Sequence, residues 1–366
     1  MKKLAHVGVD YHVKSITIAV YRADEKAFHE IIRLPNNDKS VKKYMKRLSE
    51  QFELRICYEA SGNGYAFARK MHALGYHCDV IAPSLIPKKS GDRRKNDHRD
   101  SRNLAQLYAN GQLTVVHMPD QQQESVRSLI RCRLALKESA KRIKQQINSF
   151  VLSHDCHFTQ SKWTDKHHTW LSALQFPTPH LHQVLQEYLN LLAYLESRLQ
   201  HLDQQIEQMA HSELYAPSVK RLRVLKGIGT LTAMVLIAEI TDFRRFPNPR
   251  SLMAFLGLIP GENTSDDTTK PTAITKTGNK RCRTMLVEAV QHYIKKPRIS
   301  TTTQEAFAQL DAHSSLIATK CMHRLHKRYW ALLMKGKAKQ KALVAIAREL
   351  VGFIWALMQP QDCVTL

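Results

Sequence analysis

Apolar and polar positions over the first hundred residues alternate in two periods, which predicts strands separated by helices. Short apolar or alternating runs predict strands at residues 4–13, 15–23, 29–35, 54–60 and 77–83. Apolar residues at helical spacing predict helices at residues 36–52, 62–75 and 95–107. This order, β-β-β-α-β-α-β-α, predicts an α/β domain with a mixed sheet over residues 1–118.

The next region, residues 119–215, has the pattern of long helices. Two helices are expected, at 119–153 and 182–211. The second carries apolar residues in alternating steps of three and four: Leu192, Leu195, Leu199, Leu202, Ile206 and Met209. Such a seam predicts a coiled coil for dimerisation and nucleic-acid contact, whereas an amphipathic helix in an intrachain hairpin explains it equally well.

The third region, residues 216–366, is predicted to be mainly helical. Residues 219–240 resemble a helix-hairpin-helix, with Lys226, Gly227 and Gly229 at the turn. A turn of this kind offers backbone N–H groups to a phosphate, although glycine at such a place also serves turn geometry alone. An amphipathic helix is expected at residues 337–358.

Charge narrows the choice of partner. The 366 residues include 55 Lys and Arg against 32 Asp and Glu, a net charge of +23. Because the basic residues recur along the whole chain, nucleic acid is favoured over a membrane surface. Neither an apolar run of transmembrane length nor a signal-peptide core is present, and the seven cysteines form no CxxC pair. These features predict a cytoplasmic protein with reduced thiols.

Four acidic residues form the first candidate site. Asp10 and Glu59 each end an apolar strand, and Asp97 and Asp100 lie three apart at the start of a predicted helix. Carboxylate oxygens are the ligands that Mg²⁺ prefers, and two such ions can hold the attacking and leaving oxygens of a phosphodiester. Taken singly, each acid is better explained as a cap or a surface charge, and only the combination in a basic chain favours a functional site. Basic residues precede Asp97 and are candidate phosphate contacts: Lys88, Lys89, Arg93, Arg94 and Lys95.

A second candidate site lies in the third region. Thr264 and Ser265 stand in a polar segment that is predicted to be a loop. Four cations follow that could offset the charge of a phosphate attacked by a serine: Lys276, Lys280, Arg281 and Arg283. A structural role for a loop serine is the simpler alternative.

Several segments together resemble one family. The segments GVDYHVKSITIAV, CYEASGNGY and KNDHRDSRNLA resemble the four-acid signature of the DEDD transposases of insertion-sequence family 110. The segments LKGIGTLTAMVLIAEI, RFPNPRSLMAFLGLIPGENTS and ITKTGNKRCRTMLVEA resemble that family's C-terminal transposase domain.

The resemblance implies an N-terminal ribonuclease-H-like (resolvase-like) DEDD catalytic domain at 1–118, coiled-coil helices at 119–215 and a serine-bearing C-terminal transposase domain at 216–366. It also implies an RNA-guided transposase of prokaryotes, nucleoid-associated when bound to DNA, whose structured bridge RNA pairs with donor and target DNA. The cofactor implied is Mg²⁺ or Mn²⁺, and the assembly implied is a dimer or tetramer.

On this resemblance Asp10, Glu59, Asp97 and Asp100 bind the metal and Ser265 forms a phosphoserine link to DNA. One departure is visible, because Asp266 and Asp267 follow Ser265 where the family usually has Ser-Gly. Two alternatives remain at this point. A junction-resolving nuclease would use only the acids with water as nucleophile, and a catalytically inactive relative would only bind nucleic acid.

Overall fold

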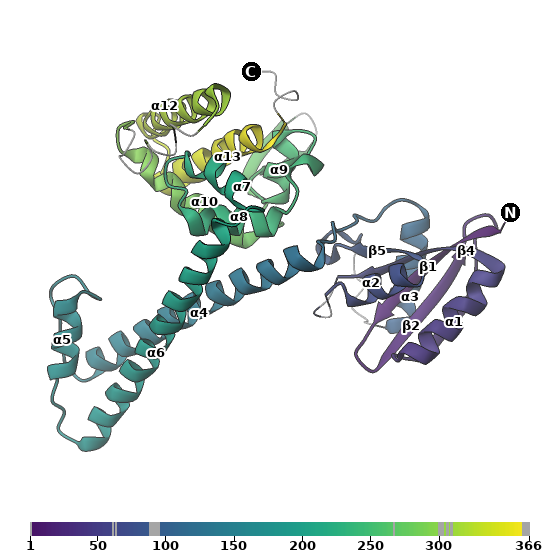
Figure 1. Ribbon diagram of the computed structural model, residues 1–366, viewed down its shortest axis with the longest axis horizontal. Helices are drawn as coiled ribbons and strands as arrows, with labels where there is room; N and C mark the ends of the chain where they lie inside the picture. Colours follow the sequence, from purple (N-terminus) through teal and green to yellow (C-terminus); the bar gives the residue numbers. More distant parts are fainter. Residues whose placement is uncertain are drawn as a thin grey trace. The chain divides into compact units, whose positions relative to one another are not determined.

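The computed structural model describes residues 2–360, except 61, 63, 88–95, 266–267, 299–303, 305–306 and 308–309, and describes only the backbone of 262–271. The chain forms two compact units, Met1–Pro119 and Asp120–Leu366 (Figure 1). Each unit is described by itself.

A mixed five-stranded sheet forms the centre of the first unit. Its strands are β1 (Lys3–Tyr11), β2 (Ser15–Arg22), β3 (Ala27–Pro35), β4 (Phe52–Glu59) and β5 (His77–Ile81). Their order across the sheet is β3-β2-β1-β4-β5, with β1, β4 and β5 parallel and β2 and β3 antiparallel to their neighbours. The prediction of an α/β fold with a mixed sheet is confirmed.

Helices cover both faces of this sheet. They are α1 (Asp38–Gln51), α2 (Ala66–Ala73) and α3 (Asp97–Ala109), with a short 3-10 turn η1 (Pro83–Leu85). Val7 and Val9 of β1 belong to the core that includes α1 and α2. The alternate positions face α3, where Ala19 packs with Ala105. The face of β1 that carries residues 8 and 10 therefore lies under α3.

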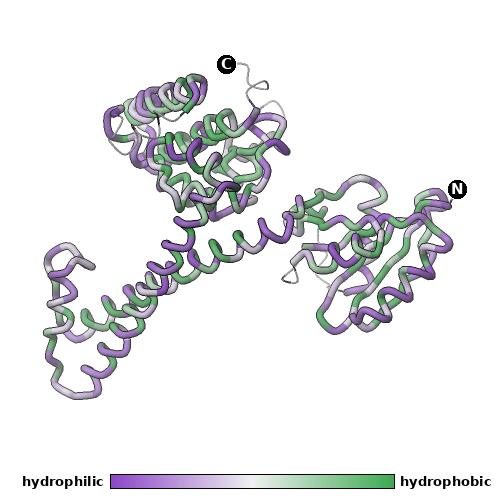
Figure 2. Tube along the Cα trace, viewed as in Figure 1, coloured by the Kyte–Doolittle hydropathy of each residue, from purple (hydrophilic) through white to green (hydrophobic). Residues whose placement is uncertain are grey.

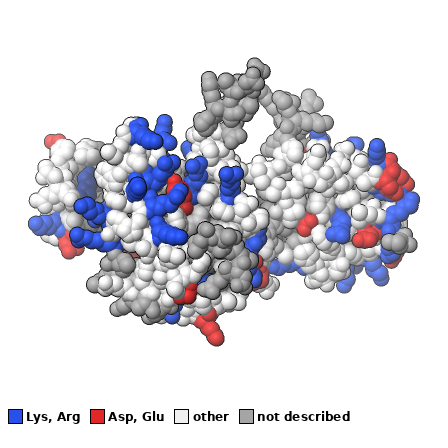
Figure 3. Space-filling model, turned by 90° about the horizontal axis from the view of Figure 1, so that it is seen from above, with Lys and Arg blue, Asp and Glu red and all other residues white. Residues whose placement is uncertain are grey.

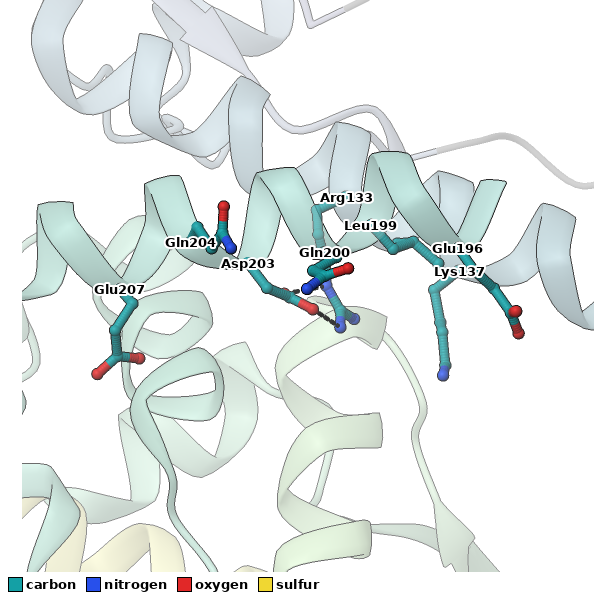
Figure 4. A pocket seen from close by; sticks show the side chains of 8 residues that line it. All are labelled: Arg133, Lys137, Glu196, Leu199, Gln200, Asp203, Gln204 and Glu207. Atoms are coloured by element: carbon teal, nitrogen blue, oxygen red, sulfur yellow. Dashed lines mark hydrogen bonds and ion pairs between the residues drawn. The ribbon is translucent and has the colours of Figure 1, made fainter. Parts of the chain in front are cut away.

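In the second unit, two long helices pair antiparallel. They are α4 (Gln121–Ser153) and α6 (Pro179–Ala210), with α5 (Asp165–Ala173) between them in sequence. Lys144 pairs with Glu196, and Arg133 pairs with Asp203. The residue numbers increase along α4 where they decrease along α6, so the two helices run in opposite directions. Figure 4 shows the open groove along this pair, lined by residues of both helices.

This pairing gives the apolar seam of α6 an intrachain partner. Leu192, Leu195 and Leu199 share a buried cluster with residues of α4. Ile206 belongs instead to the core of the helical body that follows. Of the two interpretations of the seam, the structure therefore has the intrachain hairpin, and dimerisation through these helices stays a prediction.

The rest of the second unit is a helical body around one apolar helix. Its helices are α7 (Ala216–Arg223), α8 (Thr230–Ile240), η2 (Phe243–Arg245), α9 (Pro249–Phe255), α10 (Lys280–Ala289), η3 (Val290–Ile294), α12 (Ala312–Met334) and α13 (Lys339–Met358). Residues 232–240 of α8 are all buried. Figure 2 shows the apolar positions gathered in this body, in the strands of the first unit and along α13. No helix among the described residues is long and apolar enough to cross a membrane.

One secondary-structure expectation was wrong. The segment around Ser265 is not a loop but a hairpin of β6 (Pro260–Ser265) and β7 (Thr268–Ile274), in which Ser265 pairs with Thr268. The hairpin is polar, so it lacks the apolar alternation by which strands are recognised in a sequence. The helices α5 and α12 were not predicted either.

Candidate active site

The centre of the acidic site is Asp10, near the end of β1. It pairs with Thr17 of the neighbouring strand β2. On the other side, Val9 of β1 is in register with Tyr58 of β4. The next residues along these two parallel strands are Asp10 and Glu59, which therefore point to the same face of the sheet. This is the face that α3 covers.

Helix α3 brings two further acids to that face. The helix begins after Asn96, whose side chain accepts a hydrogen bond from the N–H of His98 at 3.0 Å. Asp97 and Asp100 lie in its first turn and are half-buried. Carboxylates at a helix N-terminus also stabilise the helix itself, so their position alone does not show a function.

Gly8 allows this approach of helix and strand. A Cβ at residue 8 would lie 2.3 Å from the carbonyl oxygen of Ser101 and 2.4 Å from the nitrogen of Ala105. Only glycine therefore permits α3 to lie this close to β1. Sequence reasoning did not single out Gly8, although a glycine within an apolar strand is a signal of close backbone approach.

His12 also belongs to the cluster. Nε2 of His12 lies 3.2 Å from Oδ2 of Asp10 and 3.6 Å from Oδ1 of Asp97. Asp10, His12 and Asp97 each offer a ligand atom, and these atoms all lie within 4.8 Å of one another. His12 was not among the predicted site residues, although its spacing of two from Asp10 at a strand end was available in the sequence.

The carboxyl of Asp10 has a raised pKa because its surroundings disfavour the charged form. Burial raises the pKa of its carboxyl, and the charges of Asp97 and Asp100 raise it further, against the opposing effect of His12. The side chain is only 18% exposed. A bound cation would relieve this repulsion, so the donor set and its charge suit a divalent ion.

The other predicted residues of this site are less closely held. Glu59 is exposed at the end of β4, and neither it nor Asp100 belongs to the tight cluster of Asp10, His12 and Asp97. Lys88, Lys89, Arg93, Arg94 and Lys95 lie outside the described residues.

The second unit contains the candidate serine. Ser265 ends β6, and Thr264 precedes it on the same strand. The side chains of both and the positions of Asp266 and Asp267 lie outside the described part of the chain.

Of the four predicted cations near the serine, three are exposed and one has a structural bond. Lys276, Lys280 and Arg281 are exposed, and Lys276 has a positive φ of 55°. Arg283 is half-buried and donates to the carbonyl oxygen of Leu256 at 2.7 Å.

A buried carboxylate supports the segment that carries these cations. Glu239 of α8 accepts two hydrogen bonds from Arg131 of α4, at 2.7 and 2.8 Å. It accepts a third, at 2.7 Å, from the side-chain amide of Asn279. Asn279 also caps α10 by accepting from the N–H of Cys282. Glu239 was not predicted, because its partners are 108 and 40 residues away in sequence.

The glycine-rich turn before α8 has two distinct glycines. Gly227 has a φ of +84°, and a Cβ there would lie 2.3 Å from the carbonyl oxygen of Ala289. Gly229 caps α8 without a side-chain bond. The hydroxyl of Thr230 in the first turn donates to Glu207 at 3.2 Å, which brings a carboxylate to the place proposed for a phosphate.

Carboxylates at the strand ends of a mixed sheet, in a chain with a net charge of +23, suit a protein that binds a metal ion and nucleic acid. Comparison with known proteins agrees. Residues 7–154 match a family model described as a transposase, of the DEDD type and the IS110 group, and residues 219–304 match the transposase IS116/IS110/IS902 family.

Among similar proteins, a putative transposase, y4qE, of Sinorhizobium fredii is 37% identical over 88% of this chain and 80% of its own length. The transposase for insertion sequence element IS1533 of Leptospira borgpetersenii is 32% identical over 70% of this chain and 75% of its own. The transposase for IS1111A of Coxiella burnetii is 22% identical over 84% and 78%. The chain belongs to the IS110 family of transposases, enzymes that cut and rejoin DNA.

Proposed function

We propose that this chain moves an insertion sequence by metal-dependent transesterification, with a covalent link between Ser265 and DNA, under the guidance of a structured RNA. The observation that carries the chemical part is the close approach of Asp10 and Asp97, with Asp100 in the same helical turn as Asp97 and Glu59 beside Asp10 on the same face of the sheet. The strand order β3-β2-β1-β4-β5 supports a ribonuclease-H-like, resolvase-like unit.

The first unit would hold Mg²⁺ or Mn²⁺ through Asp10, Asp97, Asp100 and Glu59. A divalent ion supplies a Lewis acid that stabilises charge developing on phosphate oxygens. The residues of the chain set its place: Gly8 lets α3 lie on β1, and the strand ends fix two carboxylates. His12 lies within reach of the same cluster and orients Asp10.

In the second unit, Ser265 would attack the scissile phosphorus. The serine oxygen forms a bond to phosphorus as the bond to the leaving deoxyribose oxygen breaks. The serine proton is lost to a base and the leaving oxygen takes up a proton. Exposed Lys276, Lys280 and Arg281 would hold the phosphate backbone near it. Glu239, through Asn279, would position the segment that carries them.

Guidance by RNA and assembly into a dimer or tetramer rest on the resemblance and on charge. A net charge of +23 suits a protein that binds a guide RNA together with donor and target DNA. Dimerisation is assigned to the region of α4 and α6, and phosphate contact to the basic residues before Asp97 and to the turn with Lys226. The protein is proposed to act in the cytoplasm, on the nucleoid.

The experiment is a denaturing-gel assay for a covalent protein–DNA adduct with labelled element-end DNA, guide RNA and Mg²⁺. Ser265→Ala should abolish the adduct and leave RNA binding intact, whereas Thr264→Ala, the matched control one residue earlier, should keep the adduct. An adduct formed by Ser265→Ala contradicts the serine assignment. DNA cleavage by Ser265→Ala without an adduct would favour the resolvase-type nuclease, in which water is the nucleophile.

A further inference from the structure

Three segments of the second unit meet at an exposed tryptophan. They are the turn at Lys226, the end of η3 with Lys295 and Lys296, and the part of α12 that carries His326 and Trp330. We call this the Trp330 surface. The indole Nε1 of Trp330 donates to the carbonyl oxygen of Ile294 at 3.2 Å. Lys226 Nζ donates to the carbonyl oxygen of Lys296 at 3.1 Å, so separate segments are joined at one place.

Trp330 is exposed and yet held in place. Its relative exposure is 45%, although tryptophan is usually well buried. The ring of the buried Tyr329 lies edge-on to it at 5.5 Å, and the ring of His326 lies 6.5 Å away. His326 is itself fixed by a bond of Nδ1 with the carbonyl oxygen of Tyr293 at 2.9 Å. Since the only polar atom of Trp330 is already bonded, its remaining exposed surface is aromatic and nearly fixed in orientation.

The surroundings of the indole are positively charged. Lys295, Lys296 and Lys327 are exposed. Burial lowers the pKa of the Lys226 ammonium, and the charge of Lys295 lowers it further. Among the described residues, no carboxylate lies within 4.0 Å of the side-chain nitrogen of Lys226, Lys295, Lys296 or Lys327. Figure 3 shows Lys and Arg side chains gathered on one side of the second unit.

We infer that the Trp330 surface binds a single nucleic-acid strand, with one unpaired base stacked on the indole and the lysines on the flanking phosphates. An aromatic ring beside uncompensated cations matches the alternation of bases and phosphates in such a strand. In a duplex the base faces are stacked inside the helix, so a fixed indole on the protein surface cannot reach them. Duplex DNA would touch this surface through its phosphates alone.

The test is a fluorescence-anisotropy titration of the full chain against labelled 12-nucleotide oligo(dT) and oligo(rU), and against a 12-base-pair duplex. Trp330→Ala should weaken binding of the single strands about 5- to 50-fold, the effect of losing one stacked base, and duplex binding less than about twofold. Trp330→Phe should retain most of the affinity because the ring remains. Lys296→Ala should reduce the salt slope of binding by about one.

Met334→Ala is the matched control, since Met334 is 87% exposed one turn further along α12 and carries no ring. It should bind as the unchanged protein does. The inference is overturned if Trp330→Ala leaves single-strand binding unchanged, if it weakens duplex binding equally, or if Trp330→Phe binds as poorly as Trp330→Ala. Thermal unfolding confirms that each variant is folded. No cleavage reaction is involved, so the result is separate from that of the Ser265 experiment.

Discussion

Two carboxylates, one in each unit, occupy opposite electrostatic situations. Asp10 lies beside two further acids and its pKa is raised, by burial and then by their charges. Glu239 is more deeply buried, with a side chain only 1% exposed. Burial acts to raise its pKa, but the hydrogen bonds and charge of Arg131, with Asn279, outweigh burial and lower it.

This difference distinguishes Asp10, which suits a ligand of opposite charge, from Glu239, which stabilises the fold. The carboxylate of Glu239 is paired with Arg131 and hydrogen-bonded by Asn279, so groups of the chain itself stabilise its charge. For Asp10, burial and the nearby charges of Asp97 and Asp100 raise the pKa against the effect of His12, and a carboxyl pKa perturbed in this way is typical of a functional site. The predictions below test this contrast.

Loss of the central acid should have the largest effect. Asp10→Asn removes a proposed metal ligand, and we expect DNA cleavage to fall at least about 1,000-fold. The same change removes repulsion, so in EDTA the variant should unfold at the same or a higher temperature. Cleavage within about tenfold of normal, measured with element-end DNA, would contradict a metal role for Asp10.

A shift of α3 away from β1 should weaken metal binding, as Asp10→Asn does, without a change to any proposed ligand. In Gly8→Ala the new Cβ meets backbone atoms of Ser101 and Ala105, so α3 must shift and carry Asp97 away from Asp10. We expect Mn²⁺ affinity to fall about 10- to 100-fold by calorimetry, since closely set carboxylates are needed. Gly62→Ala is the control, because nothing lies within 4 Å of its Cβ. Equal affinity in both variants would show that this contact does not shape the site.

Removal of the structural carboxylate should act on stability. Glu239→Ala removes the two hydrogen bonds from Arg131 and the one from Asn279. We expect the free energy of unfolding to fall by about 2–4 kcal/mol, at the lower end because the arginine is partly exposed. Glu213→Ala, at an exposed position, should stay within about 0.5 kcal/mol. Urea unfolding measures both. A Glu239→Ala variant as stable as the control would remove the contrast between the two carboxylates.

A smaller effect of Glu239 is expected in how the stability of the fold depends on pH. Because its folded-state pKa lies below the ordinary 4.5, its ionised form stabilises the fold above that pH. This stabilisation is lost as the pH falls through the lower, folded-state pKa. Comparison of unfolding midpoints between pH 6 and pH 3 should therefore show a shallower loss in Glu239→Gln. An identical slope in both proteins would argue that Glu239 is not held as a charge.

The smallest effect is expected at His12. Imidazole nitrogen suits Mn²⁺ better than Mg²⁺, so His12→Ala should lower Mn²⁺ affinity a few-fold and Mg²⁺ affinity less. Parallel titrations with the two ions measure the ratio. An unchanged ratio would mean that His12 only orients Asp10.

The fold of the first unit was largely accessible from sequence, because its strands and helices carry clear apolar periods. Asp10 and Glu59 could be placed at strand ends for the same reason. His12 and Gly8 each carry a local signal, a spacing of two from Asp10 and a glycine within an apolar strand. These signals do not show that α3 packs on β1 at this place, so the roles of both residues appear only in the folded chain. Glu239 was missed because its two partners, Arg131 and Asn279, meet it only in the folded chain. The β6–β7 hairpin was missed because it is polar.

The central claim is that the acids of β1 and α3 form a metal site. The most direct test is a titration with Mn²⁺ in which electron paramagnetic resonance measures the free ion. The normal chain and Glu239→Gln should both bind the ion, and Asp10→Asn should lose binding. If Asp10→Asn bound Mn²⁺ as tightly as the normal chain, the acids of β1 and α3 would not be the metal site.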